Sequence, residues 1–266
     1  MTVLALSPHL DDAAFSAGGT LAALAAAGHD VVVATAFTRS VPRPTGFALA
    51  CQTDKGIAPD RDYLALRRAE DAAACAALDA EPVWLDLPEA PHRGYGSAPE
   101  LFAGARDSDA AWRDVRAALS ALAAARRPDL VLTCQGLGRH VDHDHVVRAV
   151  AGWAAPAGVP VAWWRDAPYA LRGGGTPSPA LPGGVAELAV PLGDAALAAK
   201  LDACAAYASQ LPYQFSRDAP GPPEAAMRAR LGAHARAEGA RLGACGAAEA
   251  LAAAPEAARL VAGLAR

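Results

Sequence analysis

The sequence predicts an α/β protein in which helices cover both faces of a mostly parallel, twisted, Rossmann-like sheet. Short apolar runs such as Val31-Val32-Val33 alternate with alanine-rich segments of helical length. Glycine or proline stands at many of the junctions between these segments. The 266 residues contain no internal repeat and no clear linker, so we expect one domain over residues 1–266.

The strands are expected where aliphatic and β-branched residues run together, as they do in strands buried on both faces of a parallel sheet. These runs lie at residues 3–6, 30–36, 82–86, 130–134 and 159–164, and residues 186–190 suit an edge strand.

The helices are expected in the alanine-rich segments between the strands. They lie at residues 13–27, 62–80, 110–125, 141–153, 194–208, 224–239 and 247–264. Gly28 suits the end of the first helix. Gly18 and Gly19, inside that helix, favour close packing against a neighbour. In the second helix, Leu66, Ala69, Ala73 and Ala77 form the expected inner stripe. Residues 39–59 and 87–108 are expected to be irregular, the first because it is rich in proline, glycine and threonine.

The composition excludes several classes of protein. The net charge of −4 and the absence of a basic cluster argue against nucleic-acid binding. The five cysteines show no paired spacing, which argues against a disulfide framework or a cysteine zinc site. The chain has no apolar stretch of about 18 residues to span a membrane, and its first residues lack the basic start of a signal peptide. We therefore expect a cytoplasmic protein without a membrane partner, and a homo-oligomer is compatible with the sequence.

Two clusters of histidine and aspartate follow predicted strands. His9-Leu10-Asp11-Asp12 comes just after residues 3–6, and His140-Val141-Asp142-His143 comes after residues 130–134. The carboxyl ends of parallel strands lie at one edge of a sheet, where α/β proteins bind their ligands. The two clusters are therefore expected to form one site.

The residue types in this site suit metal-assisted hydrolysis. A catalytic zinc ion takes three histidine or carboxylate ligands and lowers the pKa of bound water to about 7. A further carboxylate can act as general base, and a further imidazole can stabilise an oxyanion. Each cluster alone also has a structural interpretation, with Asp12 as a helix cap or with His140 and His143 in a capped, solvated turn.

The residues also resemble a known family. Ser7-Pro8-His9-Leu10-Asp11-Asp12-Ala13 and Gly138-Arg139-His140-Val141-Asp142-His143 are similar to the motifs of the PIG-L/LmbE superfamily of zinc-dependent N-deacetylases. The resemblance extends over most of the chain, and its further matching positions are Leu64, Arg67, Glu70, Ala74, Leu78, Asp86, Lys200 to Tyr207, Ser209 and Gln210.

The resemblance implies a role for each residue of the two clusters. His9, Asp12 and His143 would be the zinc ligands. Asp11 would be the general base that deprotonates zinc-bound water. His140 would stabilise the oxyanion and pass a proton to the leaving amine, and Asp142 would hold His140 and tune its pKa.

The sequence departs from the commoner family pattern in three places. Leu10 and Ala13 replace the proline and glutamate of His-Pro-Asp-Asp-Glu, which indicates a subgroup that includes deacetylases of antibiotic pathways and thus secondary metabolism. Gly138 stands where mycothiol-type enzymes carry a mobile tyrosine. Arg165 stands where a similar segment of the subgroup usually carries glutamate.

Other residues at the same sheet edge are candidates for substrate contact. They are Arg39, Arg93, Asp166 and Tyr169, each of which has an alternative interpretation as a salt-bridge or packing residue. Arg67 and Glu70 are spaced for a structural pair within one helix. His145 is expected in a supporting or surface position.

The sequence thus predicts a zinc-dependent amide hydrolase that removes an acetyl or other acyl group from the amine of a small metabolite. An amino sugar, a glycoside and a cysteine conjugate are all compatible substrates. Alternatives are a mycothiol-conjugate-type amidase, a catalytically inactive metal-binding relative and a nucleotide-binding protein. Asp11 and Asp12 argue against the last, because they occupy a turn where a phosphate needs glycine and backbone amides.

Overall fold

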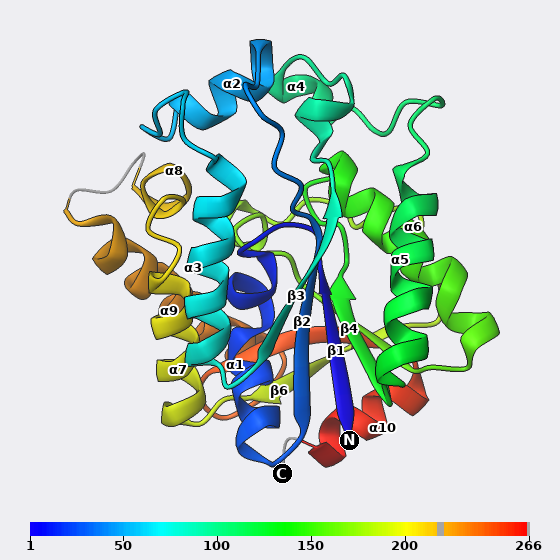
Figure 1. Cartoon of the computed structure of the whole chain (residues 1–266). Coiled ribbons are helices and arrows are strands. Elements are labelled where there is room, and N and C mark those ends of the chain that lie inside the picture. The colour runs from blue at the N-terminus through cyan, green and yellow to red at the C-terminus, as the bar shows by residue number, and fades with distance from the viewer. Residues whose placement is uncertain (217–220, 265–266) are drawn as a thin grey trace.

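A computed structural model describes residues 1–216 and 221–264 of the chain, and in them a seven-stranded sheet lies between two layers of helices (Figure 1). The strands are β1 (Thr2–Ser7), β2 (Asp30–Phe37), β3 (Glu81–Leu87), β4 (Leu130–Cys134), β5 (Val161–Trp164), β6 (Ala186–Pro191) and β7 (Ala248–Ala253). Their order is β3-β2-β1-β4-β5-β7-β6, in which the first five run parallel and β7 runs antiparallel to both of its neighbours.

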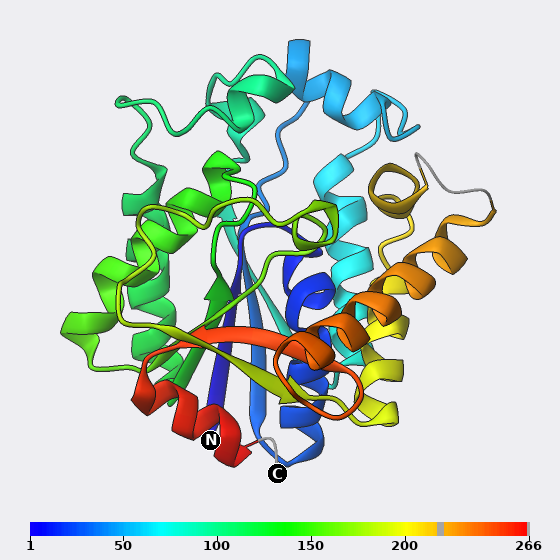
Figure 2. The same ribbon diagram turned by 180° about the vertical axis from the view of Figure 1, so that it is seen from behind.

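The helices are arranged on both faces of the sheet, as predicted (Figures 1 and 2). One side carries α1 (Asp12–Ala26), α3 (Tyr63–Ala77), α7 (Asp194–Ala205) and α9 (Pro223–Arg241), and the other carries α5 (Ala111–Arg126), α6 (Val141–Ala157) and α10 (Pro255–Leu264). Shorter helical segments are α2 (Gly46–Thr53), η1 (Ala90–Arg93), α4 (Ala98–Leu101), η2 (Ala170–Arg172) and α8 (Leu211–Phe215). The structure contains no helix among these residues that is long and apolar enough to cross a bilayer.

The apolar runs form the centre of the sheet, which confirms the predicted parallel strands. Val3 to Leu6 of β1 and Leu130 to Leu132 of β4 are 0% exposed. Central strands of a parallel sheet are covered on both faces, so an unbroken apolar run suits them.

Four predictions for individual elements are wrong. Residues 247–264 are not one helix, because residues 248–253 form β7 between β5 and β6, with every residue buried. Alanine favours helix only weakly, and burial between two strands overrides that preference. Residues 39–59, expected to be irregular, contain α2, and residues 87–108 contain η1 and α4. In α3 the expected stripe is misplaced, since Leu66 is 38% exposed while Leu64 and Ala74 are buried.

The glycine pair inside α1 allows close packing, as predicted. A Cβ on Gly19 would lie 2.6 Å from Cδ1 of Leu192, and one on Gly18 would lie 3.2 Å from Cγ of Lys200 in α7. The backbone of α1 can therefore approach α7 closely. This helix begins directly after the first His/Asp cluster, so its packing fixes one side of the site.

The order of the strands creates a switch point between β1 and β4. From β1 the chain continues to β2 on one side, and from β4 it continues to β5 on the other. Ligands of open α/β sheets bind beside the carboxyl ends of strands at such a point. Both His/Asp clusters leave the sheet there, and Figure 1 shows α2 and α4 above this edge.

Candidate active site

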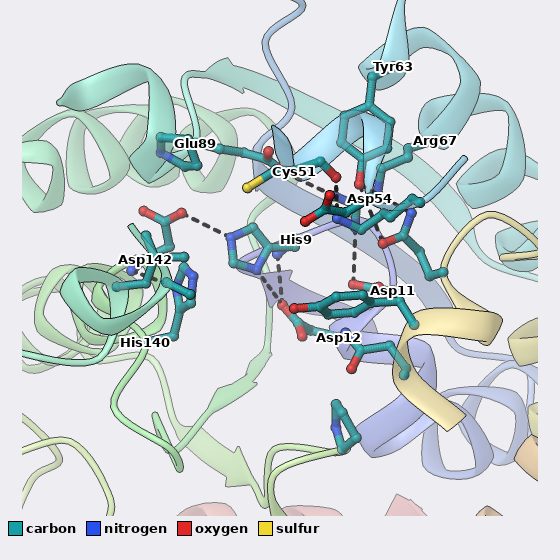
Figure 3. Close-up of a pocket in the computed structure, with 18 of the residues that line it drawn as sticks. His9, Asp11, Asp12, Cys51, Asp54, Tyr63, Arg67, Glu89, His140 and Asp142 are labelled. Atoms are coloured by element: carbon teal, nitrogen blue, oxygen red, sulfur yellow. Dashed lines mark hydrogen bonds and ion pairs between the residues drawn. The ribbon is translucent and has the colours of Figure 1, made fainter. Parts of the chain in front are cut away.

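The turn after β1 is held by the side chain that ends the strand. The hydroxyl of Ser7 donates to the carbonyl of His9 at 2.7 Å and accepts from the backbone N–H of Ala13 at 3.1 Å. These bonds set the path of the chain through His9, Asp11 and Asp12, which all line one pocket (Figure 3). On the other side of the pocket His140 stands at the N-terminus of α6, after β4.

Three side chains from the two clusters meet around one carboxylate oxygen. Nδ1 of His9 lies 3.1 Å from Oδ2 of Asp12, and Nε2 of His143 lies 3.2 Å from the same atom. Ligand atoms of the three residues all lie within 4.8 Å of one another. Two imidazoles and a carboxylate are a donor set found in catalytic zinc sites.

The environment of His143 tests whether this set fits a metal. Its Nδ1 lies 2.7 Å from Oδ1 of Asp166, and both side chains are 0% exposed. Its Nε2 is buried and lies 3.2 Å from Oδ2 of Asp12, but among the described residues it completes no well-aligned hydrogen bond. A buried polar atom without a well-aligned partner is unfavourable. Burial lowers the pKa of His143, but Asp12 and Asp166 outweigh that effect and raise it well above its usual value, so a metal ion would displace the proton of Nε2 and take its lone pair. The three residues therefore fit a metal ion.

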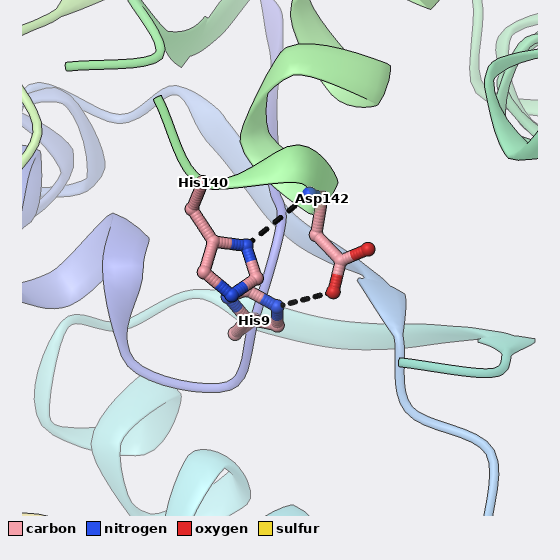
Figure 4. A group of neighbouring side chains, drawn as sticks. All are labelled: His9, His140 and Asp142. Carbon is pink, nitrogen blue, oxygen red and sulfur yellow. Dashed lines mark hydrogen bonds and ion pairs between the residues drawn. The ribbon is translucent and has the colours of Figure 1, made fainter. Parts of the chain in front are cut away.

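The second nitrogen of His9 is also held by a carboxylate. Its Nε2 lies 2.9 Å from Oδ2 of Asp142 (Figure 4). Metal-bound histidines commonly have such a carboxylate on their other nitrogen. Asp142 was predicted to hold His140, but its side chain contacts His9 instead. Only the backbone N–H of Asp142 reaches His140, donating to Nδ1 at 3.2 Å.

This backbone bond defines the form of His140. Because Nδ1 accepts a hydrogen bond, the neutral ring carries its own proton on Nε2. Burial lowers the pKa of His140 to about 3, although Asp142 opposes this effect. His140 is consequently neutral near pH 7 and can donate a hydrogen bond from Nε2. Ligand atoms of His9, His140 and Asp142 also lie close enough together to share one metal ion, but Nε2 of His9 already bonds to Asp142, and Nδ1 of His140 accepts from its backbone N–H.

Asp11 lies beside the three candidate ligands and is not one of them. It is 6% exposed, and its Oδ1 lies 3.3 Å from Nη2 of Arg67. Nη1 of the same arginine bonds to Glu89 at 2.9 Å. Burial raises the pKa of Asp11 to about 7, against the opposing effect of Arg67. Arg67 was predicted to pair with Glu70, which instead accepts two bonds from Ser209.

His9 is strongly influenced by its neighbouring carboxylates. Burial lowers the pKa of its imidazole, but Asp12 and Asp142 outweigh that effect and raise it to about 9. The metal-free site therefore holds a protonated His9 at neutral pH. A metal ion must displace that proton to bind Nδ1.

Much of the pocket wall was not identified from the sequence. Phe47 of α2 and Leu101 of α4 line it together with Phe102, and Gln210 and Tyr213 line it from the segment around α8. Phe102 is 43% exposed, and its ring centroid lies 5.4 Å from that of His140. The sequence did contain one indication of this wall, because Phe102 is a large aromatic residue in a loop that also contains glycine and proline.

The predicted substrate-contact residues have different positions. Tyr169 lines the pocket, where a Cβ on Gly138 would lie 2.5 Å from its ring. The other three do not line it. Asp166 is buried beside His143, Arg39 pairs with Asp86 in solvent, and Arg93 is engaged by Asp109 and Asp142. Their charges were visible in the sequence, but their partners lie 16 to 49 positions away.

His145 is buried, and its Nε2 lies 3.0 Å from Asp109. This places it in the supporting position that was one of the two predictions for it. Arg165 pairs with Glu187 at 3.0 Å and is not part of the pocket lining.

Comparisons with known proteins place the chain in a family. The family profile described as PIG-L, GlcNAc-PI de-N-acetylase, matches residues 4–154. A 2′-N-acetylparomamine deacetylase from Streptomyces fradiae is 34% identical over 168 residues, which are 63% of this chain and 57% of that protein. The shared region thus spans little more than half of that relative.

Solved structures match over almost the whole chain. The zinc-inhibited form of the teicoplanin deacetylase Orf2 is 27% identical, covers 95% of this chain and 97% of its own, and has a TM-score of 0.80. The A40926 pseudoaglycone deacetylase Dbv21 is 30% identical, covers 94% and 96%, and has a TM-score of 0.75.

Proposed function

The chain belongs to the PIG-L family, and on this premise we propose that it is a metal-dependent N-deacetylase that acts on a glycosylated small molecule. The observation that carries the proposal is the arrangement of His9, Asp12 and His143 around one point, with Asp11 beside them and outside the set. The three proposed metal ligands and the proposed general base, Asp11, are thus four different side chains. Zinc is the proposed metal.

A divalent metal, when bound here, supplies Lewis acidity that lowers the pKa of water and polarises an acyl oxygen. His9, Asp12 and His143 would hold it. Asp142 and Asp166 orient the two imidazoles by accepting from their outward nitrogens. Held in this way, each ring presents its other nitrogen toward Asp12.

We assign the transfer of protons to Asp11. Its carboxylate accepts a proton from the attacking water as the new carbon–oxygen bond forms. The carboxylic acid then returns the proton to the amide nitrogen as the carbon–nitrogen bond breaks, which yields a carboxylic acid and a free amine. Arg67 holds Oδ1 of Asp11 and so limits the directions in which the carboxylate can turn.

His140 is proposed to stabilise the oxyanion. A neutral imidazole can donate a hydrogen bond to an oxygen that gains negative charge in the transition state. The N–H of Asp142 fixes the ring so that Nε2 carries the proton. With a pKa lowered to about 3, His140 is suited to hydrogen bonding and less suited to full proton donation, which refines the role that the sequence suggested.

The substrate class rests on the pocket and on the relatives together. The relatives named above are deacetylases of 2′-N-acetylparomamine, of teicoplanin and of the A40926 pseudoaglycone. The pocket joins the polar cluster to a wall that includes Phe47, Leu101 and Phe102. Aromatic and aliphatic side chains of this kind contact the apolar faces of a ring or an acyl group. An N-acetylated amino sugar within a larger glycoside fits this combination.

The variant Asp11→Asn tests the proposal. The substituted amide keeps the shape of the side chain but cannot take a proton, so kcat should fall by about 10² to 10⁴. The bound metal should remain at one ion per chain because Asp11 is not a ligand. Asp129→Asn, at an exposed carboxylate that accepts from the backbone N–H of Thr2 at the start of β1, is the matched control and should keep full activity. An active Asp11→Asn enzyme, or one that loses its metal together with its activity, would contradict the assignment.

A further inference from the structure

Arg93 lies at the centre of a buried cluster outside the pocket. It ends the η1 turn in the segment between β3 and α5. Its Nη1 donates to the carbonyl of Pro88 at 2.7 Å, its Nη2 bonds to Asp109 at 3.0 Å and to Asp142 at 2.7 Å, and its Nε bonds to Asp109 at 3.2 Å. Its side chain is 12% exposed. All of its nitrogens are thus used in fixed contacts.

Asp142 joins this cluster to the candidate metal ligands. Its Oδ1 accepts from Arg93, and its Oδ2 lies 2.9 Å from Nε2 of His9 and accepts from the backbone N–H of Ala90 at 3.1 Å. The carboxylate is 0% exposed. Both of its oxygens are held by hydrogen bonds, and two of these bonds come from residues of the η1 turn. The orientation of the carboxylate is therefore fixed.

This arrangement determines the orientation of the His9 ring. The carboxylate that accepts the hydrogen bond from Nε2 fixes how the ring is turned and where the lone pair of Nδ1 points. If Asp142 were free to rotate, His9 would have no fixed partner on its outward nitrogen. Arg93 is the cation that holds Asp142, and Asp109 in turn holds Arg93 through two nitrogens.

We propose that Arg93 is a positioning residue that orients the metal ligand His9 through Asp142 and ties the η1 turn to the metal centre. This inference rests on the proposed function, because it assumes that His9 binds a metal. It replaces the role in substrate contact that the charge of Arg93 suggests. Residues that support a metal ligand in this way typically contribute about 10- to 100-fold to metal affinity.

The test is the zinc affinity of purified, metal-stripped variants, measured by competition with a chromogenic chelator. Arg93→Met should weaken zinc binding by about 10- to 100-fold. Arg93→Lys keeps the charge but not the forked geometry, so it should fall between Arg93→Met and the wild type. Arg106→Met is the matched control, because Arg106 lies in the same segment but bonds to Glu100 and to the carbonyl of Gly94. It should bind zinc within about twofold of the wild type, since neither partner supports a metal ligand.

A spectroscopic measurement separates orientation from general weakening. With Co²⁺ in place of zinc, the visible absorption bands report the geometry of the ligands, and they should shift in Arg93→Met but not in Arg106→Met. Wild-type affinity and wild-type Co²⁺ bands in folded Arg93→Met would overturn the inference. If Arg93→Met does not fold, the same two measurements on Arg93→Lys decide. A wild-type protein that binds no metal would instead overturn the proposed function, and this inference with it.

Discussion

A buried ion pair between Lys200 and Glu249 should contribute strongly to stability. Lys200 lies in α7 and Glu249 in β7, their side chains are 3% exposed, and Nζ lies 2.5 Å from Oε1. Glu249 also accepts from the backbone N–H groups of Gly19 and Thr20 in α1, at 3.0 and 2.7 Å, and from the Thr20 hydroxyl at 2.6 Å. The pair therefore connects α1, which follows the candidate site, to the antiparallel part of the sheet.

The cost of breaking this pair depends on which partner is removed. Loss of one member of a buried ion pair costs about 3–5 kcal/mol. Lys200→Met leaves Glu249 with three donors, so the loss should be about 3 kcal/mol. Glu249→Gln leaves the ammonium with an uncharged amide and, at 3.4 Å, the carbonyl of Ser16, so the loss should be about 4–5 kcal/mol.

The double variant gives the sharper test. It leaves neither charge uncompensated, so its loss should be smaller than the sum of the two single losses by about 2 kcal/mol. The assay is urea unfolding at pH 7 with equal m-values. Arg228→Met, which breaks only pairs at the surface with Asp202 and Glu224, is the control and should cost less than about 1 kcal/mol. Single losses below about 1 kcal/mol, or losses that add within about 0.5 kcal/mol, would show that the pair does not act as a buried, coupled unit.

Three further predictions concern the site. His140→Ala should lower kcat by about 10² to 10³ while zinc stays bound, because it removes the proposed oxyanion donor; steady-state kinetics with metal analysis checks this, and unchanged kcat would contradict it. Phe102→Ala should raise KM by about tenfold with little change in kcat, since it removes one apolar face worth about 1–2 kcal/mol; a fall in kcat alone would argue against a binding role. Zinc affinity should rise with pH by at least about tenfold per unit between pH 7 and 9, because the pKa of His9 in the metal-free protein is raised to about 9, that of His143 is also raised well above its usual value, and zinc displaces these protons; an affinity that does not vary with pH would contradict this assignment.

The sequence was most informative where local pattern and tertiary environment agree. The apolar runs of β1 and β4 lie at the centre of the sheet, so burial on both faces matches their composition. The two His/Asp clusters follow those strands directly, and parallel topology is enough to bring them to one edge. For this reason the joint site could be predicted without a structure.

Other features depend on contacts that no local pattern reveals. Residues 248–253 favour helix by composition, but the gap between β5 and β6 makes them a strand. The choice between His9 and His140 as the partner of Asp142 depends on the direction in which one side chain points at the start of α6. Arg93 carries the charge expected of a substrate contact, and only its position beside Asp109 and Asp142 shows otherwise.

The most direct test of metal-dependent deacetylation is to strip the protein of metal with a chelator and to titrate zinc back while measuring release of amine from an N-acetylated amino sugar glycoside. We predict no release by the stripped protein and a return of activity that is complete at one zinc ion per chain. His143→Ala should not recover at that ratio, because it lacks one of the three proposed ligands. Full activity of the metal-free protein would contradict the proposed function.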